Sequence, residues 1–319
     1  MKGLDLIKGN IIWIVFGFLF FYVALILFSD ANKIFDHFIN IKIELILLMF
    51  FFGISSHIIK SFRQKEFLQM LDEKISFKQN LIIYLAGLSL IATPGGIGIF
   101  IKAKFLKRKF GIPNNKSVTV IFLERYHDIL AGTSIILISF SLSFSLISVT
   151  LIIISSFLLI VLYLLMCNMK TFSFIQSKLL KIKFIAKRLP EVGPDESFFI
   201  LTRATPMTKG WLISIAAWSL DSLAVYVGFL SFNVDLGYLL TSQIYLTSLG
   251  YGILSLLPGG IGVTEGVGNY LLIKQGLDLS IASSLVIFTR LITLWGATVV
   301  GMIFTRYALE QNANLRKTK

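Results

Sequence analysis

Six long apolar segments constrain the fold of this 319-residue chain more than any other feature. A helix needs about 20 mostly apolar residues to cross the hydrocarbon core of a bilayer. Only 15% of the residues are charged, whereas an average soluble domain has about 25%. The sequence therefore predicts an all-α, polytopic integral membrane protein. The six predicted full spans are Ile11–Phe28, Ile43–Ile59, Val118–Phe140, Phe144–Met166, Trp211–Phe232 and Ile281–Arg306.

Two further apolar stretches are interrupted by proline and glycine. Leu81–Ala92 leads into Thr-Pro-Gly-Gly-Ile-Gly at residues 93–98, and Leu239–Leu257 leads into Pro-Gly-Gly-Ile-Gly at residues 258–262. Proline removes a helical hydrogen-bond donor and glycine loosens the backbone, so each helix should break there. The arm that follows each break is too short to cross a core of about 30 Å. We expect two re-entrant helical hairpins, with a pair of kinked full spans as the alternative.

Basic residues indicate the orientation of the chain in the membrane. With both termini in the cytoplasm, 25 of the 30 Lys and Arg residues fall on the inner side, as the positive-inside rule requires. The outer side carries Lys33, Lys42 and Lys274, and only Arg125 and Arg290 remain inside predicted spans. The net charge of +13 is thus explained as a topology signal of a cytoplasmic-membrane protein and not as a nucleic-acid footprint. The inner segments are the N-terminus, Lys60–Lys78, Lys102–Lys116, Lys170–Lys209 and the tail from Arg306.

The longest predicted inner loop, residues 168–209, alternates apolar and basic side chains between Phe172 and Leu189. This pattern is typical of an amphipathic helix on an anionic leaflet. A solvated linker that only obeys the topology rule explains it equally well.

The two Pro-Gly-Gly-Ile-Gly strings, 164 positions apart, mark an internal repeat. Arg125 follows Pro94 by 31 residues, and Arg290 follows Pro258 by 32. Three predicted spans separate the hairpins, and because three is odd the hairpins should open toward opposite sides. The chain therefore divides into two inverted halves, 1–142 and 143–319, within one membrane domain. Inverted repeats with broken helices are typical of alternating-access transporters.

Charged residues inside predicted spans are the candidate site, because a charge at the bilayer centre costs about 2.5–3.5 kcal/mol on insertion scales. Arg125 can pair with Asp128 at i,i+3 or leave its guanidinium for a phosphate. Arg290 has no acidic neighbour in its own helix, so its candidate partners are Glu265 and Asp221. Backbone N–H groups at the breaks would favour an anion. The candidate substrate-binding residues are Arg125, Arg290, Asp128, Glu124, Glu265, Asp221 and Lys102, and the breaks are Pro94, Gly95, Gly96, Gly98, Pro258, Gly259, Gly260 and Gly262.

Missing signatures exclude several activities. The chain has no P-loop and no Gly-x-Ser-x-Gly elbow, so neither an ATPase nor a hydrolase of that type is expected. One cysteine, Cys167, permits no disulfide framework, and no Cys/His cluster accompanies it. We expect no metal and no cofactor.

The repeat residues resemble a known family. Residues 93–98, followed by Lys102-Ala103 and by Glu124-Arg125 with Asp128, are similar to its first-half pattern. Leu257 to Gly266, followed by Gly276 and Arg290, is similar to its second-half pattern. The family is the flippase-like membrane domain of lysylphosphatidylglycerol synthases, which also occurs as stand-alone proteins of about this length. One departure is Ile99, where the family often carries a glutamate.

The resemblance implies transbilayer movement of a lipid. Lysyl-phosphatidylglycerol synthesis is not implied, because the soluble aminoacyl-transferring domain of the fused synthases is absent. We therefore expect a flippase for an anionic phospholipid or a polyprenyl-linked glycolipid. The alternatives are a membrane accessory subunit of a glycosyltransferase or lipid-modifying system, and an intramembrane transferase.

Overall fold

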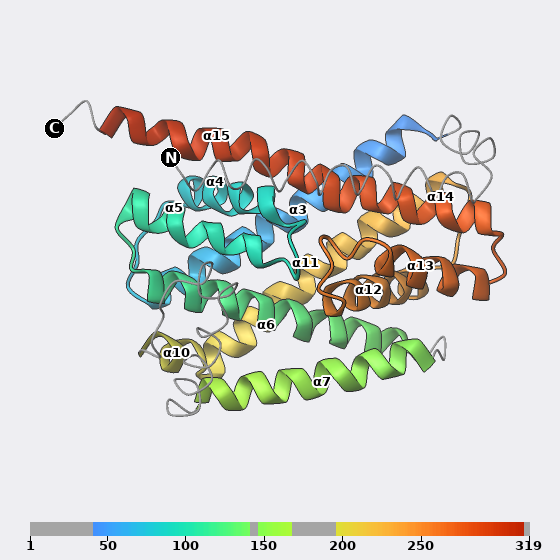
Figure 1. Cartoon of the computed structure of the whole chain (residues 1–319), viewed down its shortest axis with the longest axis horizontal. Coiled ribbons are helices and arrows are strands. Elements are labelled where there is room, and N and C mark those ends of the chain that lie inside the picture. The colour runs from blue at the N-terminus through green and yellow to red at the C-terminus, as the bar shows by residue number, and fades with distance from the viewer. Residues whose placement is uncertain (1–40, 141–145, 168–195, 316–319) are drawn as a thin grey trace.

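The computed structural model describes residues 41–140, 146–167 and 196–315, and the secondary structure in these ranges is helical (Figure 1). No β-sheet forms among these residues, so the all-α prediction is confirmed for them. The predicted first span, Ile11–Phe28, and the predicted amphipathic helix at residues 172–189 lie outside the described residues. The long helices are α3 (Ile43–Met70), α6 (Asn114–Ser139), α7 (Leu146–Cys167), α11 (Ala204–Ser231) and α15 (Ala297–Leu315).

Four helices in the described part of the chain are long and apolar enough to cross a membrane. They are Ile43–Met70, Leu146–Tyr163, Ala204–Ser231 and Leu279–Leu309, and the last runs through α14 (Leu279–Arg290), the π-helix η3 (Leu291–Gly296) and α15. Helix α6 corresponds to the predicted span Val118–Phe140. It is not among the four candidate membrane helices, because charged residues interrupt its apolar stretch. That α6 crosses the membrane stays a prediction.

Two predicted boundaries are wrong. Helix α3 continues eleven residues beyond Ile59, because no glycine or proline occurs between Ile59 and Met70 to end it. Helix α11 begins at Ala204 and so takes in the end of the predicted inner loop, while α10 (Glu196–Leu201) precedes it. As a result, Lys60 and Arg63 are buried helical residues and not loop charges.

Both interrupted stretches form helix–break–helix hairpins. The first joins α4 (Phe77–Gly87) and the 3₁₀ turn η1 (Leu88–Leu90) to η2 (Ile97–Phe100) and α5 (Ile101–Phe110). The second joins α12 (Tyr238–Leu254) to α13 (Val263–Lys274).

The two breaks fold alike. Gly95 and Gly96 have φ of 58° and 67°, and Gly259 and Gly260 have φ of 61° and 68°. These left-handed conformations suit glycine, because a Cβ would be strained there. The identical strings at the two breaks therefore encode the same turn.

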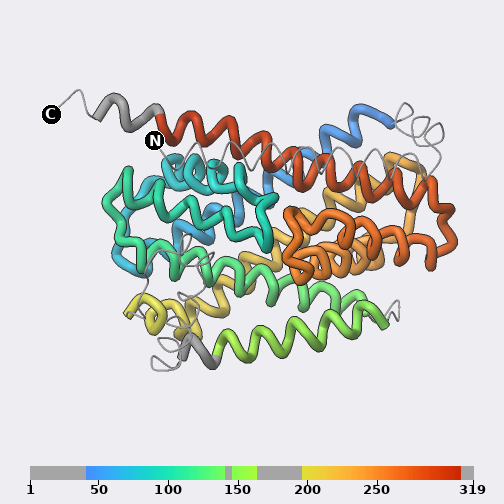
Figure 2. The backbone as a smooth tube through the Cα atoms, in the orientation of Figure 1, coloured from blue at the N-terminus to red at the C-terminus, as the bar shows by residue number. Residues whose placement is uncertain are grey.

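The hairpins enter from opposite ends of the molecule, and their tips meet near its centre (Figures 1 and 2). An isolated antiparallel bridge pairs Pro94 of the first tip with Pro258 of the second. The α3–α4 turn lies at one end of the long axis and the α13–α14 turn at the other (Figure 1).

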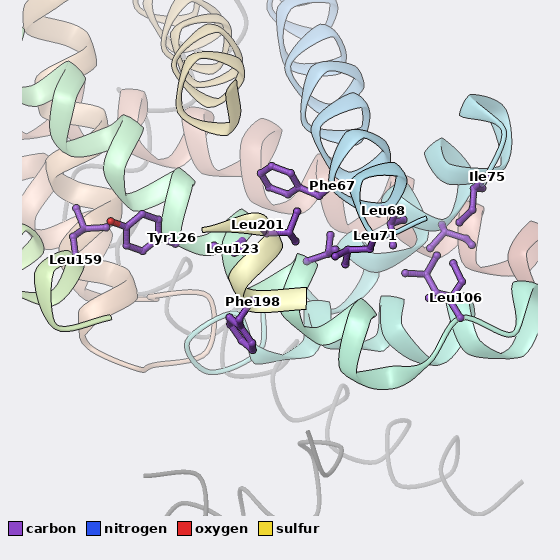
Figure 3. Close-up of a cluster of buried hydrophobic side chains, with 13 residues drawn as sticks. Phe67, Leu68, Leu71, Ile75, Leu106, Leu123, Tyr126, Leu159, Phe198 and Leu201 are labelled. Carbon is purple, nitrogen blue, oxygen red and sulfur yellow. The ribbon is translucent and has the colours of Figure 1, made fainter. Parts of the chain in front are cut away.

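Each hairpin packs into its own apolar cluster. The first cluster gathers Leu68, Ile83, Leu106 and Leu123 with residues of α7 and α10 (Figure 3). The second surrounds α12 and α13 with residues such as Val225, Leu271 and Leu285. Burial of these side chains supplies the hydrophobic contacts that hold each hairpin against α6 or α14.

Helix α15 lies along the first hairpin. A Cβ on Gly301 would sit 2.1 Å from the backbone nitrogen of Ser89, so the two backbones are in direct contact there. Thr305 Oγ1 also donates to the carbonyl of Ala86, over 3.1 Å. The helix that carries Arg290 of the second half thus continues into the packing of the first hairpin.

Candidate functional site

Seven charged side chains from α3, α5, α6 and α11 form ion pairs in the interior, and we call them the central cluster. Six of them are buried, and the side chain of Arg125 is 36% exposed. Their members are Lys60, Arg63, Lys102, Glu124, Arg125, Asp128 and Asp221. Five of these seven were predicted from the sequence.

Asp128 is the hub of the central cluster. Its Oδ1 accepts from Arg63 Nη1 at 2.8 Å and from Trp218 Nε1 at 3.0 Å. Its Oδ2 lies 2.9 Å from Arg125 Nη2. The i,i+3 spacing on α6 places Arg125 beside Asp128, and the extension of α3 beyond Ile59 brings in Arg63. The sequence allowed Arg125 either to pair with Asp128 or to stay unpaired, and the pair forms.

Asp221 on α11 pairs with Lys60 on α3, and not with Arg290. The Lys60 ammonium also lies 3.8 Å from the centre of the Trp218 ring, in a cation–π contact. Trp218 therefore links the Lys60–Asp221 pair to Asp128 through its ring face and its N–H group.

Lys102 pairs with Glu124, and both side chains are fully buried. Its ammonium also donates to Gln64 Oε1 at 2.9 Å, and Gln64 in turn donates to Asn80 Oδ1 at 3.0 Å. Gly87 makes room for this lysine, since a Cβ there would lie 2.4 Å from Lys102 Cγ. The pair fastens α5 of the first hairpin to α6.

A second buried pair lies at the other break. Arg290 Nε donates to Glu265 Oε1 at 2.9 Å, and Arg290 Nη2 donates to the carbonyl oxygen of Gly259. The other carboxylate oxygen of Glu265 accepts the backbone N–H of Gly262 at 2.7 Å. Of the two candidate partners of Arg290, the structure selects Glu265. The pair ties the second break to α14.

A small cavity adjoins Arg290, between α11, α12, α13 and α14. Its walls are mostly apolar, with Val225, Phe229 and Val286 among them, and Arg290 and Thr264 also line it. The hydroxyl of Thr264 is buried and has no hydrogen-bond partner among the described residues. Neither the cavity nor this hydroxyl was predicted from the sequence.

One interpretation of the basic residues needs correction. Arg125 and Arg290 are not the only cations that escape the topology explanation, because Lys60, Arg63 and Lys102 are buried and paired as well. Lys60 and Arg63 were missed because the span was ended at Ile59. The absence of any glycine or proline between Ile59 and Asp72 is the signal that could have found them.

The ring nitrogens of His127 lie beside backbone carbonyls, and its ring packs against Phe67 with the centroids 5.4 Å apart. Its Nδ1 lies 2.7 Å from the carbonyl of Leu123, and its Nε2 lies 3.1 Å from that of Met207. Among the described residues, no group of three or more His, Cys, Asp and Glu side chains could hold a metal ion.

Comparison with known proteins assigns the chain to a family. The profile described as the lysylphosphatidylglycerol synthase TM region matches residues 12–301, which include both hairpins and the whole central cluster. The chain belongs to this lysylphosphatidylglycerol synthase transmembrane region family. The recognition made from the two Gly-rich motifs is therefore confirmed.

Relatives of this lysylphosphatidylglycerol synthase TM region protein occur in archaea. It is 22% identical to the UPF0104 membrane protein MJ1595 of Methanocaldococcus jannaschii, over 95% of this chain and 96% of that protein. It is 28% identical to the UPF0104 membrane protein MJ1078 of the same organism, over 69% and 93%. A match to the UPF0104 membrane protein PH1989 of Pyrococcus horikoshii is 30% identical but covers 38% of this chain and 37% of that protein. The protein is thus a multi-pass membrane member of the family.

Proposed function

We propose that this protein moves a phospholipid or a polyprenyl-linked glycolipid between the two leaflets of the cell membrane, without an ATPase of its own. The observation that carries this proposal is the central cluster, which places seven charged groups inside a bundle of membrane-length helices. Charges at such depth are costly and typically mark a substrate pathway. A polar head group needs such an interior route across the hydrocarbon core.

The arrangement of the hairpins supports an alternating-access mechanism. Each half contributes one broken hairpin and one arginine-bearing helix, and the hairpins enter from opposite ends (Figure 1). This is the geometry expected of two inverted repeats with re-entrant hairpins. In transporters of this kind, one repeat rocks against the other around a site near the midplane.

The residues divide into two roles under this proposal. Arg125 contacts the head group of the lipid, because it is the member of the central cluster whose side chain is partly exposed. Asp128 and Glu124 orient the cations beside them. Arg290 and Glu265 hold the second break in shape, and Arg290 also lines the apolar cavity.

The family assignment supports a membrane role. We expect no lysyl-phosphatidylglycerol synthase activity, because the resemblance that suggests the family covers its membrane domain only. We also propose that both termini are cytoplasmic, as the distribution of basic residues predicts. A glycosyltransferase or lipid-modifying enzyme that uses the translocated lipid is the expected partner class.

Reconstitution into liposomes tests the proposal. The purified full chain is inserted into vesicles with fluorescent lipids of several head groups, and the fraction that reaches the outer leaflet is followed with a membrane-impermeant quencher. We expect faster exchange of at least one lipid, and loss of that exchange in Arg125→Ala. Lys209→Ala, which removes a half-exposed cation of α11, is the matched control.

Two results would contradict the flippase proposal. The first is no exchange of any lipid in the panel by wild-type protein that remains folded. The second is an unchanged cellular phenotype after combined Arg125→Ala and Arg290→Ala substitution, which would favour an accessory subunit that moves no lipid.

A further inference from the structure

Asp128 holds two guanidinium groups side by side. Arg63 reaches Oδ1 from α3, and Arg125 reaches Oδ2 from its own helix, at 2.8 Å and 2.9 Å. A single carboxylate therefore fixes the positions of two planar cations that come from different helices. Arginine presents five N–H donors in a fixed fork, so one carboxylate cannot use the donors of both.

The donors that Asp128 leaves over are buried. Arg63 Nε, Arg63 Nη2 and Arg125 Nε have no hydrogen-bond partner among the described residues, and the side chain of Arg63 is 0% exposed. A buried charged donor without an acceptor is costly, and native proteins seldom leave one unexplained. Two acceptors of the central cluster, Glu124 Oε1 and Asp128 Oδ2, also lack a hydrogen-bond partner in the described part of the chain. The three unpaired donor atoms outnumber them by one, which indicates that a further acceptor belongs in the cluster.

The charge balance of the central cluster points to the sign of that acceptor. Four cations, Lys60, Arg63, Lys102 and Arg125, face three carboxylates from Glu124, Asp128 and Asp221. One positive charge is therefore in excess within a low-dielectric bundle, where an uncompensated charge is strongly disfavoured. One bound monoanion would neutralise the cluster.

We propose that Arg63 and Arg125, held together by Asp128, form a binding site for a singly charged phosphate group. Phosphate oxygens match the planar donor fork of arginine, which binds them in bidentate fashion. Arg125 forms the open edge of the site because it is partly exposed, and Arg63 forms its buried wall. This inference deepens the proposed function, because it assigns an anionic phosphodiester as the lipid head group.

The other buried arginine does not offer the same site. Arg290 pairs with Glu265, one cation with one carboxylate, and its Nη2 is already bound to the carbonyl of Gly259. In the described part of the chain, the two halves therefore differ. The first half carries the anion site, and the second half carries an arginine that positions the break.

Trp218 provides a readout inside the site, since its indole N–H donates to Asp128. In the full chain with Trp13, Trp211 and Trp295 replaced by phenylalanine, the fluorescence of Trp218 is titrated in two arms. One arm adds phosphatidylglycerol to phosphatidylcholine nanodiscs, and the other adds inorganic phosphate to the same nanodiscs. We expect saturable changes with phosphatidylglycerol, and about tenfold weaker binding in Arg125→Gln, as for loss of one charged hydrogen bond.

Control variants distinguish a loss of anion binding from a loss of folding. Arg125→Lys keeps the charge and should lie between wild type and Arg125→Gln, whereas Lys209→Gln should bind like wild type. Arg63→Gln should also weaken binding. If the Arg63→Gln variant does not fold, the Arg125→Gln variant tests the site by itself, because the side chain of Arg125 is partly exposed and its replacement should not disturb folding. Equal binding by Arg125→Gln and wild type, or no saturation in either arm, would overturn the anion site.

The two arms also identify the source of the anion. Saturation by inorganic phosphate alone would support an anion site but overturn its assignment to a lipid head group. Lipid exchange measured in parallel separates this inference from the proposed function. If lipid exchange occurs but binding does not depend on Arg125, only the anion-site proposal is contradicted. If the lipid binds but is not exchanged between leaflets, only the flippase proposal is contradicted.

Discussion

Pro94 and Pro258 lie 164 positions apart in the chain and face each other across an antiparallel backbone bridge at the centre of the bundle. Each proline opens a Gly-Gly turn of the same left-handed geometry, so the contact joins two equivalent tips. Arg290 donates to the carbonyl of Gly259, the residue next to this bridge. The bridge is thus a direct backbone contact between the two hairpins, beside the buried Arg290.

A disulfide between the two tips should lock the hairpins together. Opposed residues of an antiparallel pair have Cα atoms about 4.5–5.5 Å apart, within the range of about 4.4–6.8 Å that a disulfide spans. In a Cys167→Ser background, Pro94→Cys combined with Pro258→Cys should form an intramolecular disulfide under mild oxidation. Lipid exchange should fall on oxidation and return on reduction, because rocking needs the tips to separate.

Each single cysteine variant serves as the control for this lock, since it should respond to neither oxidant nor reductant. A double variant that forms the disulfide and still exchanges lipid at the wild-type rate would show that the tips do not separate during transport.

Gly301 should be intolerant of any side chain. A Cβ at this position would lie 2.1 Å from Ser89 N and 2.6 Å from Leu88 C, and backbone atoms cannot move aside as a side chain can. We expect Gly301→Ala to destabilise the protein by about 1–3 kcal/mol, as overpacking does. Thermal unfolding of the purified protein in detergent measures this loss.

Gly53→Ala is the matched control for Gly301. Gly53 also lies inside a long helix, but a Cβ there would meet nothing within 4 Å. Alanine should stabilise that helix by up to about 1 kcal/mol. Equal behaviour of the two variants would mean that α15 does not contact the first hairpin as closely as the structure places it.

Replacing one member of the Glu265–Arg290 pair should destabilise the protein more than replacing both members. Glu265→Leu leaves a buried arginine without its carboxylate, which we expect to cost about 3–5 kcal/mol of stability. Adding Arg290→Met should restore part of that loss, because an apolar pair removes the stranded charge. Unfolding midpoints of both variants test this expectation.

The exposed pair of Lys209 and Glu66 is the comparison for that experiment. Lys209→Met should change stability by no more than about 1 kcal/mol, as is usual for surface ion pairs. If Glu265→Leu costs no more than Lys209→Met, the pair does not hold the second break.

The Pro-Gly-Gly-Ile-Gly strings predicted the two hairpins from the sequence, because proline and glycine change the conformation of the backbone nearest to them. The Arg125–Asp128 pair was foreseeable for the same reason, since i,i+3 neighbours on a helix are fixed by its pitch. Contacts such as Arg63 with Asp128 depend on how α3 crosses α6, and no spacing within one helix encodes that crossing. The meeting of Pro94 with Pro258 likewise depends on the packing of the whole bundle.

The bases of the two hairpins should be reachable from opposite sides of the membrane. Lys74 lies in the exposed α3–α4 turn and Gln275 in the exposed α13–α14 turn, and these turns occupy opposite ends of the molecule (Figure 1). In the Cys167→Ser background, an impermeant maleimide should label Gln275→Cys in intact cells. It should label Lys74→Cys only in inside-out vesicles, because basic residues cluster on the cytoplasmic side. The cysteine-free protein gives the background, and labelling of both positions from one side would refute the inverted arrangement.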